Sequence, residues 1–493
     1  MKKLLYLSLA FICLSSPTFG ETYILDLEKS IGIAKEKSYD MLNLKQNLKI
    51  AEFNLKSVTS RFKTHVDLDL TSPEYTDRIN KFVDTAGISY SPVRLLSYEG
   101  ALTIKQPLPT DGNISIISGM NNYDDFIRDK RSLNMSTQLQ LTQPLNSLYG
   151  YNSIKSSLKQ AQLGYELSSK QLKRAELNLV YNVTYTFFNL LSVQKREEIA
   201  KLNLERQKEA YSIAKNKYDA GLIKEVEALQ MEVDLSEAQN NYDMSIIDQS
   251  SAMNQLKELI GIEFKDSIVL SSAMDYKVVL INAEKALQLA MDNRLEIREQ
   301  EIQIEQNKIN IKRQKAQGMI KGDLVASLGL SGISEQNRHS ALSESVNYAY
   351  DNLLDGRKSF GVGFRVSIPI IDWGENRALV NAAKAQLQQS IYSQEETKRS
   401  IEREIRDLVA NLNSSLKRLQ LLEKSVLVAE KSFDITRQRF SDGDIDSQSL
   451  ALERERLNTS YTSHLSAYIT YELMLADLMR KTFYDFQRES LIQ

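Results

Sequence analysis

The chain has 493 residues, with 62 basic and 64 acidic side chains and a formal net charge of only −2. Such a balance lacks the basic footprint that nucleic-acid binding requires, so we expect no nucleic-acid partner. Seven prolines and 19 glycines are few for this length, which indicates long helices and strands with few interruptions.

Residues 1–20 read MKKLLYLSLAFICLSSPTFG. Two lysines, an apolar stretch over 4–14 and small residues near Gly20 are typical of a secretory signal peptide. Cys13, the only cysteine, lies inside it, so we expect no disulfide in the mature chain. No later run reaches about 18 apolar residues, which excludes a transmembrane helix, whereas transmembrane β-strands need only about 10 alternating residues and stay open.

The rest of the chain repeats itself in order. The aligned segments are 27–41 with 283–297, 65–70 with 321–326, 143–162 with 368–386, and 215–223 with 437–445. The pattern predicts a first repeat over 21–261, a linker over 262–283 and a second repeat over 284–493. The offset falls from 256 to about 225, so the first repeat carries about 31 extra residues within 71–132.

Each repeat is predicted to run helix, strands, long helix, tight turn, helix. Alternating apolar residues such as Phe360, Val362 and Phe364 predict strands, and an extra hairpin is predicted around the turn at 107–113. Apolar residues recur at threes and fours along the longest helix, which indicates a coiled coil about 95–100 Å long. The expected ranges are helix 27–63, strands 65–144, helices 152–218 and 222–260, then helix 284–317, strands 323–371, and helices 376–440 and 446–486.

Four long strands per chain are too few to close a barrel, which takes about eight. We therefore expect several copies to pool their strands, with apolar side chains toward lipid and small polar ones toward water. The predicted fold is mixed α and β, a long antiparallel helical coiled-coil barrel joined to a transmembrane β-barrel pooled from several protomers. A sheet packed on a soluble core is the alternative.

Three segments carry a family resemblance. IPIIDWGENRALVNAAKAQ (368–386) resembles the strand-to-helix signature of TolC-like outer-membrane efflux and secretion channels. KNKYDAGLIKEVEALQ and RQRFSDGDIDSQSLALE resemble the helix-to-helix turns of that family. The resemblance implies an outer-membrane homotrimer with a large periplasmic part, in which each protomer gives four strands to one 12-stranded barrel. It also implies a passive exit duct for efflux or type I secretion that contacts outer-membrane lipid, a periplasmic adaptor and an inner-membrane transporter.

The resemblance also assigns roles to residues. The membrane-exit turns would contain Pro144, Gly150, Pro369, Asp372, Trp373 and Gly374. The periplasmic tip, where the adaptor would bind, would contain Tyr218, Gly221, Leu222, Ile223, Phe440, Gly443, Asp444 and Ile445. Glu227 and Asp446 are candidates for a pore constriction there. Independently of the family, Gly221 and Gly443 suit a left-handed helix end.

Enzymatic and metal-binding interpretations have little support in the sequence. The three histidines are scattered, and residues 442–453 imitate a calcium loop but place Ser447 where that loop needs glycine. We expect no catalytic activity, cofactor or metal. A trimeric surface coiled coil resembling an adhesin and a soluble periplasmic scaffold are the competing interpretations. The transported substrate stays open, and the insertion could be a surface loop or a periplasmic hairpin.

Overall fold

The computed structural model describes residues 22–84, 87–145, 150–271, 274–356 and 358–491. The expected signal peptide and Cys13 lie outside these ranges. The chain forms two compact units, each built from both predicted repeats. Unit 1 comprises Met1–Asn47, Ser169–Arg298 and Gln394–Gln493, and unit 2 comprises Leu48–Ser168 and Glu299–Ser393.

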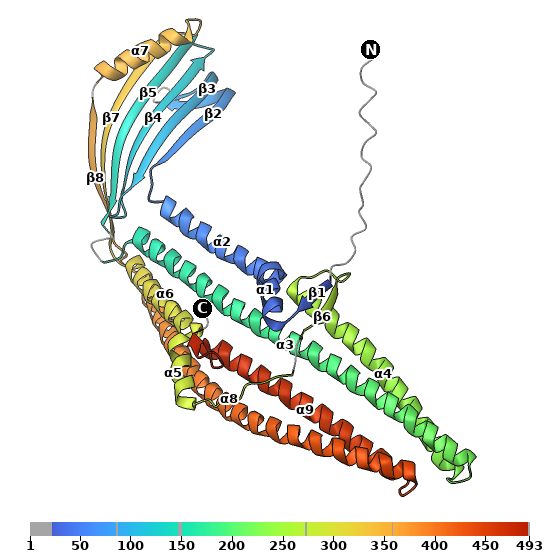
Figure 1. Ribbon diagram of the computed structural model, residues 1–493. Helices are drawn as coiled ribbons and strands as arrows, with labels where there is room; N and C mark the ends of the chain where they lie inside the picture. Colours follow the sequence, from blue (N-terminus) through green and yellow to red (C-terminus); the bar gives the residue numbers. More distant parts are fainter. Residues whose placement is uncertain (1–21, 85–86, 146–149, 272–273, 357, 492–493) are drawn as a thin grey trace, which may run out of the picture. The chain divides into compact units, whose positions relative to one another are not determined.

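Unit 1 is helical (Figure 1). It holds α1 (Leu27–Lys37), α4 (Glu225–Ile260), α5 (Ala283–Asn293), α9 (Ser447–Thr482) and the later parts of α3 (Ser153–Asp219) and α8 (Glu375–Asp442). A short parallel pair joins β1 (Thr22–Leu25) to β6 (Ser267–Leu270), and β9 (Tyr484–Asp485) pairs with β10 (Ser490–Leu491). The helices α3 and α8 have 67 and 68 residues, as the scarcity of helix breakers predicts.

The core of unit 1 is a continuous apolar cluster. It is made mainly of leucine, isoleucine and aromatic side chains of α3, α8 and α9 that are almost inaccessible to water, among them Phe187, Leu190, Ile405, Leu412 and Tyr471. Along α8 the buried positions recur at threes and fours, which is the seam that the sequence pattern predicts.

The two helices expected at 27–63 and 284–317 are each broken once. The first is split at Ser38, after α1 and before α2 (Tyr39–Ser60), and the second at Arg294, before α6 (Leu295–Gln317). The two break residues lie 256 positions apart, which is the offset of the predicted repeat. Both have an extended ψ, near 132° and 121°, although neither is proline or glycine.

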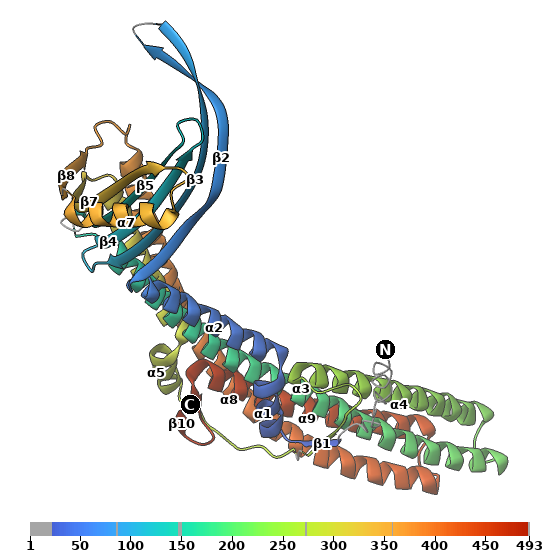
Figure 2. The same ribbon diagram turned by 90° about the horizontal axis from the view of Figure 1, so that it is seen from above.

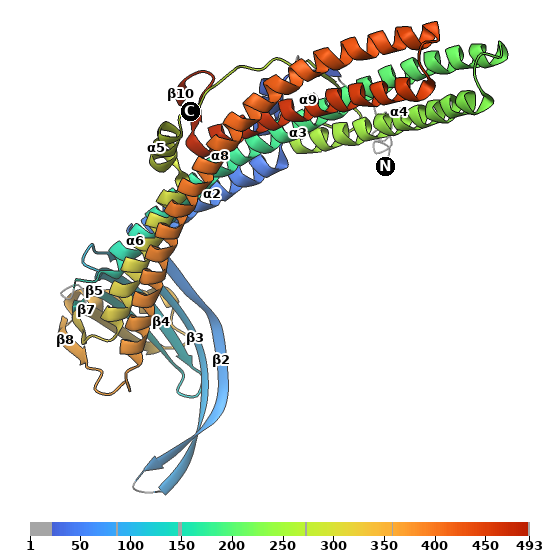
Figure 3. The same cartoon turned by 90° about the horizontal axis from the view of Figure 1, so that it is seen from below.

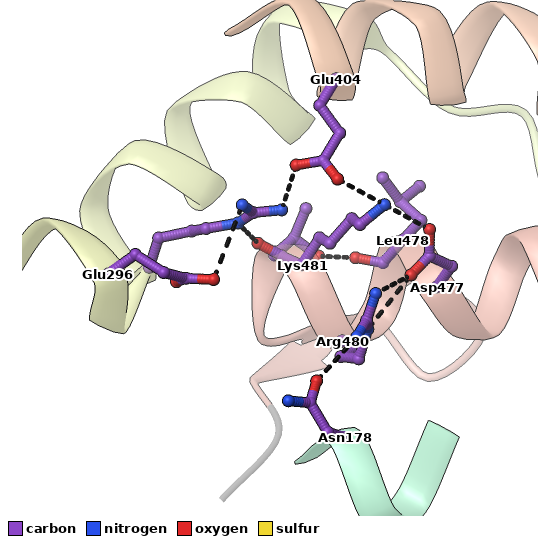
Figure 4. A network of polar contacts seen from close by, with 9 residues as sticks. Asn178, Glu296, Glu404, Asp477, Leu478, Arg480 and Lys481 are labelled. Carbon is purple, nitrogen blue, oxygen red and sulfur yellow. Dashed lines mark hydrogen bonds and ion pairs between the residues drawn. The ribbon is translucent and has the colours of Figure 1, made fainter. Parts of the chain in front are cut away.

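Tertiary contacts explain the second break. The Arg294 side chain is only 9% exposed; its guanidinium bonds the Glu404 carboxylate at 2.7 Å and donates to the carbonyl of Lys481 at 3.3 Å. Glu404 also meets the Lys481 ammonium at 2.7 Å (Figure 4). The guanidinium is buried although the Glu404 side chain is 38% exposed, and these charge-assisted hydrogen bonds stabilise the break against the local helical preference.

Unit 2 contains a six-stranded antiparallel sheet in the order β2-β3-β4-β5-β7-β8. The strands are β2 (His65–Asp84), β3 (Gly87–Pro107), β4 (Asn113–Asp125), β5 (Lys130–Pro144), β7 (Lys321–Asn337) and β8 (Ser359–Ser367). The expectation of four strands per chain is therefore wrong for this sheet. The hairpin predicted inside the insertion exists, and its strands β3 and β4 are inserted between β2 and β5.

The ends of β2 and β3 form a ribbon beyond the rest of the sheet (Figure 2). Pairing of β3 with β4 begins only at Leu95 opposite Asp125, so the residues before Leu95 pair with β2 alone. The same unit holds α6, the beginnings of α3 and α8, and most of α2.

The helix α7 (Leu342–Asp355) lies across β7 and β5 at one end of the sheet (Figure 1). Ser345 and Ala349 of α7 and Leu133 of β5 are completely buried there. The contact is close because Gly332 of β7 has no side chain: an added Cβ would lie 2.0 Å from the carbonyl oxygen of Ala349. A side chain at position 332 would collide with the backbone of α7, so only glycine allows the helix to pack this closely on β7.

Candidate functional site

The tip of the α3–α4 hairpin is a glycine-capped turn. The amide of Leu222 donates to the carbonyl of Lys217 and that of Gly221 to the carbonyl of Tyr218, both at 2.8 Å. Gly221 has φ 70°. These are the two bonds of a Schellman motif, in which a left-handed residue satisfies the last carbonyls of a helix.

The α8–α9 hairpin ends in the same way. Asp444 donates to the carbonyl of Arg439 at 2.9 Å and Gly443 to that of Phe440 at 3.2 Å, with φ 91° at Gly443. The two turns lie at the same end of unit 1 (Figure 3). The left-handed helix ends predicted at Gly221 and Gly443 are confirmed.

Behind the turns the two hairpins share a small apolar cluster. Phe440 is 2% exposed and packs with Met231, Leu450 and partners from all four helices, and Ile223 and Ile445 lie against this cluster. Tyr218, Leu222 and Asp444 are exposed, Leu222 to 73%. Of the predicted tip residues, some therefore hold the tip together and others are accessible at its surface.

The two candidate constriction residues differ in their local role. Asp446 is the N-cap of α9: its carboxylate accepts the amide of Ser449 at 2.9 Å, and hydrogen bonds from Ser449 hold the pKa of Asp446 below its usual value. Glu227 is half-buried in the first turn of α4. A constriction formed by either residue stays a prediction.

A polar network that no local sequence pattern indicates joins the two hairpins. Arg454 of α9 pairs with Asp234 of α4 at 3.2 Å and donates to Gln207 of α3. Gln207 is 1% exposed and donates to the carbonyl of Met231 at 3.5 Å. Because these groups are shielded from water, each loses more by losing its partner than a surface pair would.

The turn after β8 is built around Asp372. Its carboxylate accepts the amide of Gly374 at 2.9 Å and that of Asn376 at 3.2 Å, so it caps the beginning of α8, and these bonds lower the pKa of Asp372. Trp373 and Gly374 have positive φ angles, 52° and 85°. Trp373 is 95% exposed.

The strand before this turn is shorter than expected. β8 ends at Ser367, which pairs with Lys321, the first residue of β7, so the partner strand offers no further backbone groups. Pro369 follows in an irregular segment, consistent with its missing amide donor.

The corresponding turn of the first half uses a distant residue. Pro144 is the last residue of β5, and Gly150 has φ 75°; the intervening residues 146–149 lie outside the described ranges. The amides of Ser153 and Ile154 at the beginning of α3 donate to the carboxylate of Asp111 at 3.0 and 3.1 Å. Asp111 belongs to the β3–β4 turn, so the insertion supplies the cap.

Metal and membrane-helix features are absent from the described ranges. There, no three or more His, Cys, Asp or Glu side chains gather into a group that could hold a metal ion. No helix in the described part of the chain combines the length and apolarity needed to cross a bilayer.

Replacing Gly221 with alanine is expected to lower the free energy of unfolding by about 1 kcal/mol, because the Cβ of alanine makes the left-handed backbone conformation unfavourable. Gly164, inside α3, is a matched control. At both positions an added Cβ meets no described atom within 4 Å, but Gly164 is helical, so alanine there should stabilise by about 0.5–1 kcal/mol. Urea unfolding followed by circular dichroism measures both; equal effects would contradict the left-handed cap.

Glu472 in α9 gives unit 1 a pH dependence. Burial raises the pKa of Glu472 to about 7. The folded protein then holds a proton that the unfolded chain has released, so stability falls as pH rises from about 4.5 to about 7 and is flat above. The stability of Glu472→Gln relative to wild type should increase by about 3 kcal/mol across this window. Thermal unfolding of both proteins at pH 5, 6, 7 and 8 tests this. A stability difference between variant and wild type that stays the same at every pH would refute the buried carboxylate.

Comparison with known proteins gives a consistent result. The family model described as "Outer membrane efflux protein" matches residues 97–262 and 286–460. The alkaline protease secretion protein AprF of Pseudomonas aeruginosa is 20% identical over 65% of this chain, and the match spans 63% of that protein, less than two thirds of its length.

Solved structures share the fold. The CmeC outer membrane channel of Campylobacter jejuni superposes with a TM-score of 0.68 at 17% identity, covering 92% of this chain and 85% of that one. The open MtrE outer membrane channel of Neisseria gonorrhoeae gives 0.65 at 18%, covering 95% and 90%. The predicted resemblance to TolC-like channels and the mixed helical and β architecture are confirmed. The family model covers more than half of the chain, so this protein belongs to the outer membrane efflux protein family and is an outer-membrane protein with a large periplasmic helical part.

Proposed function

We propose that the protein is a passive outer-membrane exit duct of a tripartite efflux or type I secretion system. One observation carries the proposal. The same chain presents a sheet with a belt of exposed apolar side chains, among them Val66, Leu328 and Phe360, and two helical hairpins with accessible, glycine-capped tips. The belt suits lipid contact, and the tips suit a protein partner. The match to the outer membrane efflux protein family and the structural similarity to an outer membrane channel support both assignments.

The working form would be a homotrimer, with the predicted repeats 21–261 and 284–493 each giving strands to the wall and a hairpin to the tunnel. The tips would contact a periplasmic adaptor, and an inner-membrane transporter would supply the energy. The match to a protein named for alkaline protease secretion favours a secretion system, whereas the family model described as an outer membrane efflux protein favours efflux.

Localisation and assembly are tested by membrane fractionation and chemical crosslinking of the native protein. We expect it in the outer membrane as a trimer. A soluble monomer would refute the duct and favour a periplasmic scaffold. If the protein is a trimer but deletion of its gene leaves drug susceptibility and protein secretion unchanged, the surface-protein interpretation is favoured.

The adaptor contact is tested with a photo-reactive amino acid at Leu222, which is 73% exposed at the tip. Leu421, 69% exposed within α8, is the matched control away from the turn. We expect an adaptor crosslink from position 222 and none from 421. Crosslinks from both or neither position would contradict a contact made by the tip.

Gly221→Val and Gly443→Val should impair export while the trimer still assembles, because the strain of a β-branched residue in a left-handed conformation is confined to the turn. Export is followed as drug susceptibility or secreted protein, and assembly by native electrophoresis. Equal loss of assembly and export would assign these glycines a structural role only.

A further inference from the structure

The two strands added by the insertion are integral members of the sheet. β3 pairs with β2 from Lys105 opposite His65 to Gly87 opposite Asp84, and with β4 from Pro107 opposite Asn113 to Leu95 opposite Asp125. β4 then pairs along its whole length with β5. The insertion is thus neither a loose surface loop nor a separate hairpin.

The predicted repeat identifies which strands are added. β2 and β7 begin in segments that align at the offset of 256, and Pro144 at the end of β5 aligns with Pro369 after β8 at an offset of 225. β3 and β4 therefore have no counterparts in the second half. The sheet consists of four strands common to both halves and one extra pair.

The extra strands continue the faces of their neighbours. One apolar row crosses all six strands in register: Val66, Ile104, Ile116, Leu139, Leu328 and Phe360. Five of its six members are exposed large hydrophobic residues, from 40% at Ile116 to 76% at Phe360. The row one position below, on the opposite face, is almost entirely polar or small: His65, Lys105, Ser115, Gln140, Ser327 and Gly361. Apolar belts on one face and small polar groups on the other are typical of strands between lipid and water.

The turn of the extra hairpin is fixed at the helical end of the sheet. Besides the cap that Asp111 gives to α3, the Thr110 hydroxyl donates to the Gln143 side chain at 2.6 Å, and the Gln143 amide donates to the Thr110 carbonyl at 2.8 Å. An added Cβ at Gly112 would lie 2.7 Å from the carbonyl oxygen of Thr142. These contacts hold β3 and β4 in the wall beside β5.

The two edge strands of the sheet can pair with each other between copies of the chain. Among the described strands, β2 and β8 each pair on one side only, which leaves backbone donors and acceptors free. Because six antiparallel strands alternate in direction, β2 and β8 run in opposite directions. The β8 of one copy can therefore pair in antiparallel fashion with the β2 of the next, and repetition closes a ring.

Building on the proposed trimeric duct, we propose that three copies of this chain close an 18-stranded barrel through their β2 and β8 edges, rather than the 12-stranded one that the family resemblance implies. Barrel diameter grows roughly linearly with strand number, so the exit is about 1.5 times wider at equal strand tilt. The insertion thereby widens the duct at the outer membrane.

Electron cryomicroscopy of the purified full-length protein in lipid nanodiscs tests the strand number directly. We expect a trimer with 18 strands in which β3 and β4 lie in the wall. A trimeric channel with a 12-stranded wall would overturn this inference and leave the proposed function standing. Absence of any shared barrel would overturn both.

Single-cysteine labelling in outer-membrane preparations tests the same point without a structure. With Cys13 replaced by serine, Ile116→Cys and Ile117→Cys are matched variants on opposite faces of β4, and Leu139→Cys and Gln138→Cys are their references on β5. A hydrophilic maleimide should label positions 117 and 138 and spare 116 and 139. Labelling of both β4 positions, with the β5 contrast intact, would place β4 outside the wall.

Discussion

The Arg294→Ala variant is expected to lose about 2–3 kcal/mol of unfolding free energy, because removal of the buried guanidinium takes a cation from the partly exposed Glu404 carboxylate and from a helix-end carbonyl. Arg294 is 9% exposed and bonds Glu404 at 2.7 Å, within a network that continues through Lys481 to Asp477 (Figure 4). Lys481 still meets Glu404 in the variant, which keeps the loss below that of a fully isolated charge. Urea unfolding followed by circular dichroism measures it.

The control for this variant is Arg406→Ala. Arg406 pairs with Glu284 at 2.9 Å, but the two side chains are 46% and 73% exposed, and such surface pairs contribute about 0–1 kcal/mol. A large loss of stability for Arg294→Ala with little change for Arg406→Ala would show that the contribution of the Arg294 ion pair depends on the burial of Arg294. Similar small losses would mean that solvent reaches the Arg294 network.

Gly332→Val is expected to displace α7 from the sheet. The new Cβ would meet the carbonyl oxygen of Ala349 at 2.0 Å and the amide nitrogen of Leu353 at 2.3 Å, and backbone atoms cannot move aside as a flexible side chain can. We expect overpacking to cost at least about 3 kcal/mol. Faster amide hydrogen exchange over residues 342–355, measured by mass spectrometry, reports the displacement.

Gly363→Val is the matched control for α7. Gly363 lies in β8 of the same sheet, and an added Cβ there meets no described atom within 4 Å. We expect exchange in α7 to stay at the wild-type rate. If both variants loosen α7, valine disturbs the sheet as a whole, and the close contact at Gly332 is not the cause.

Whether a functional residue could be predicted from the sequence depends on how far along the chain its contacts lie. Gly221, Gly443 and Asp372 act on backbone groups within a few residues, so short segments of sequence were enough to predict the two left-handed helix ends and to place Asp372 in a turn. Asp111 reaches the amides of Ser153 and Ile154, more than 40 residues away. Arg454 joins residues of two other helices. For such contacts a local pattern holds no information.

The sequence by itself determined the long helices, the alternating strands and the left-handed tips, because rare breakers, a two-residue period and glycine act through the local backbone. Only the tertiary structure decided that the insertion becomes two interior strands of a six-stranded sheet, and that helices break at Ser38 and Arg294. The strands β3 and β4 are stabilised by backbone pairing with the flanking strands β2 and β5, which the pattern of a single segment does not reveal. The break at Arg294 is stabilised by partners distant in the chain, Glu404 and the end of α9.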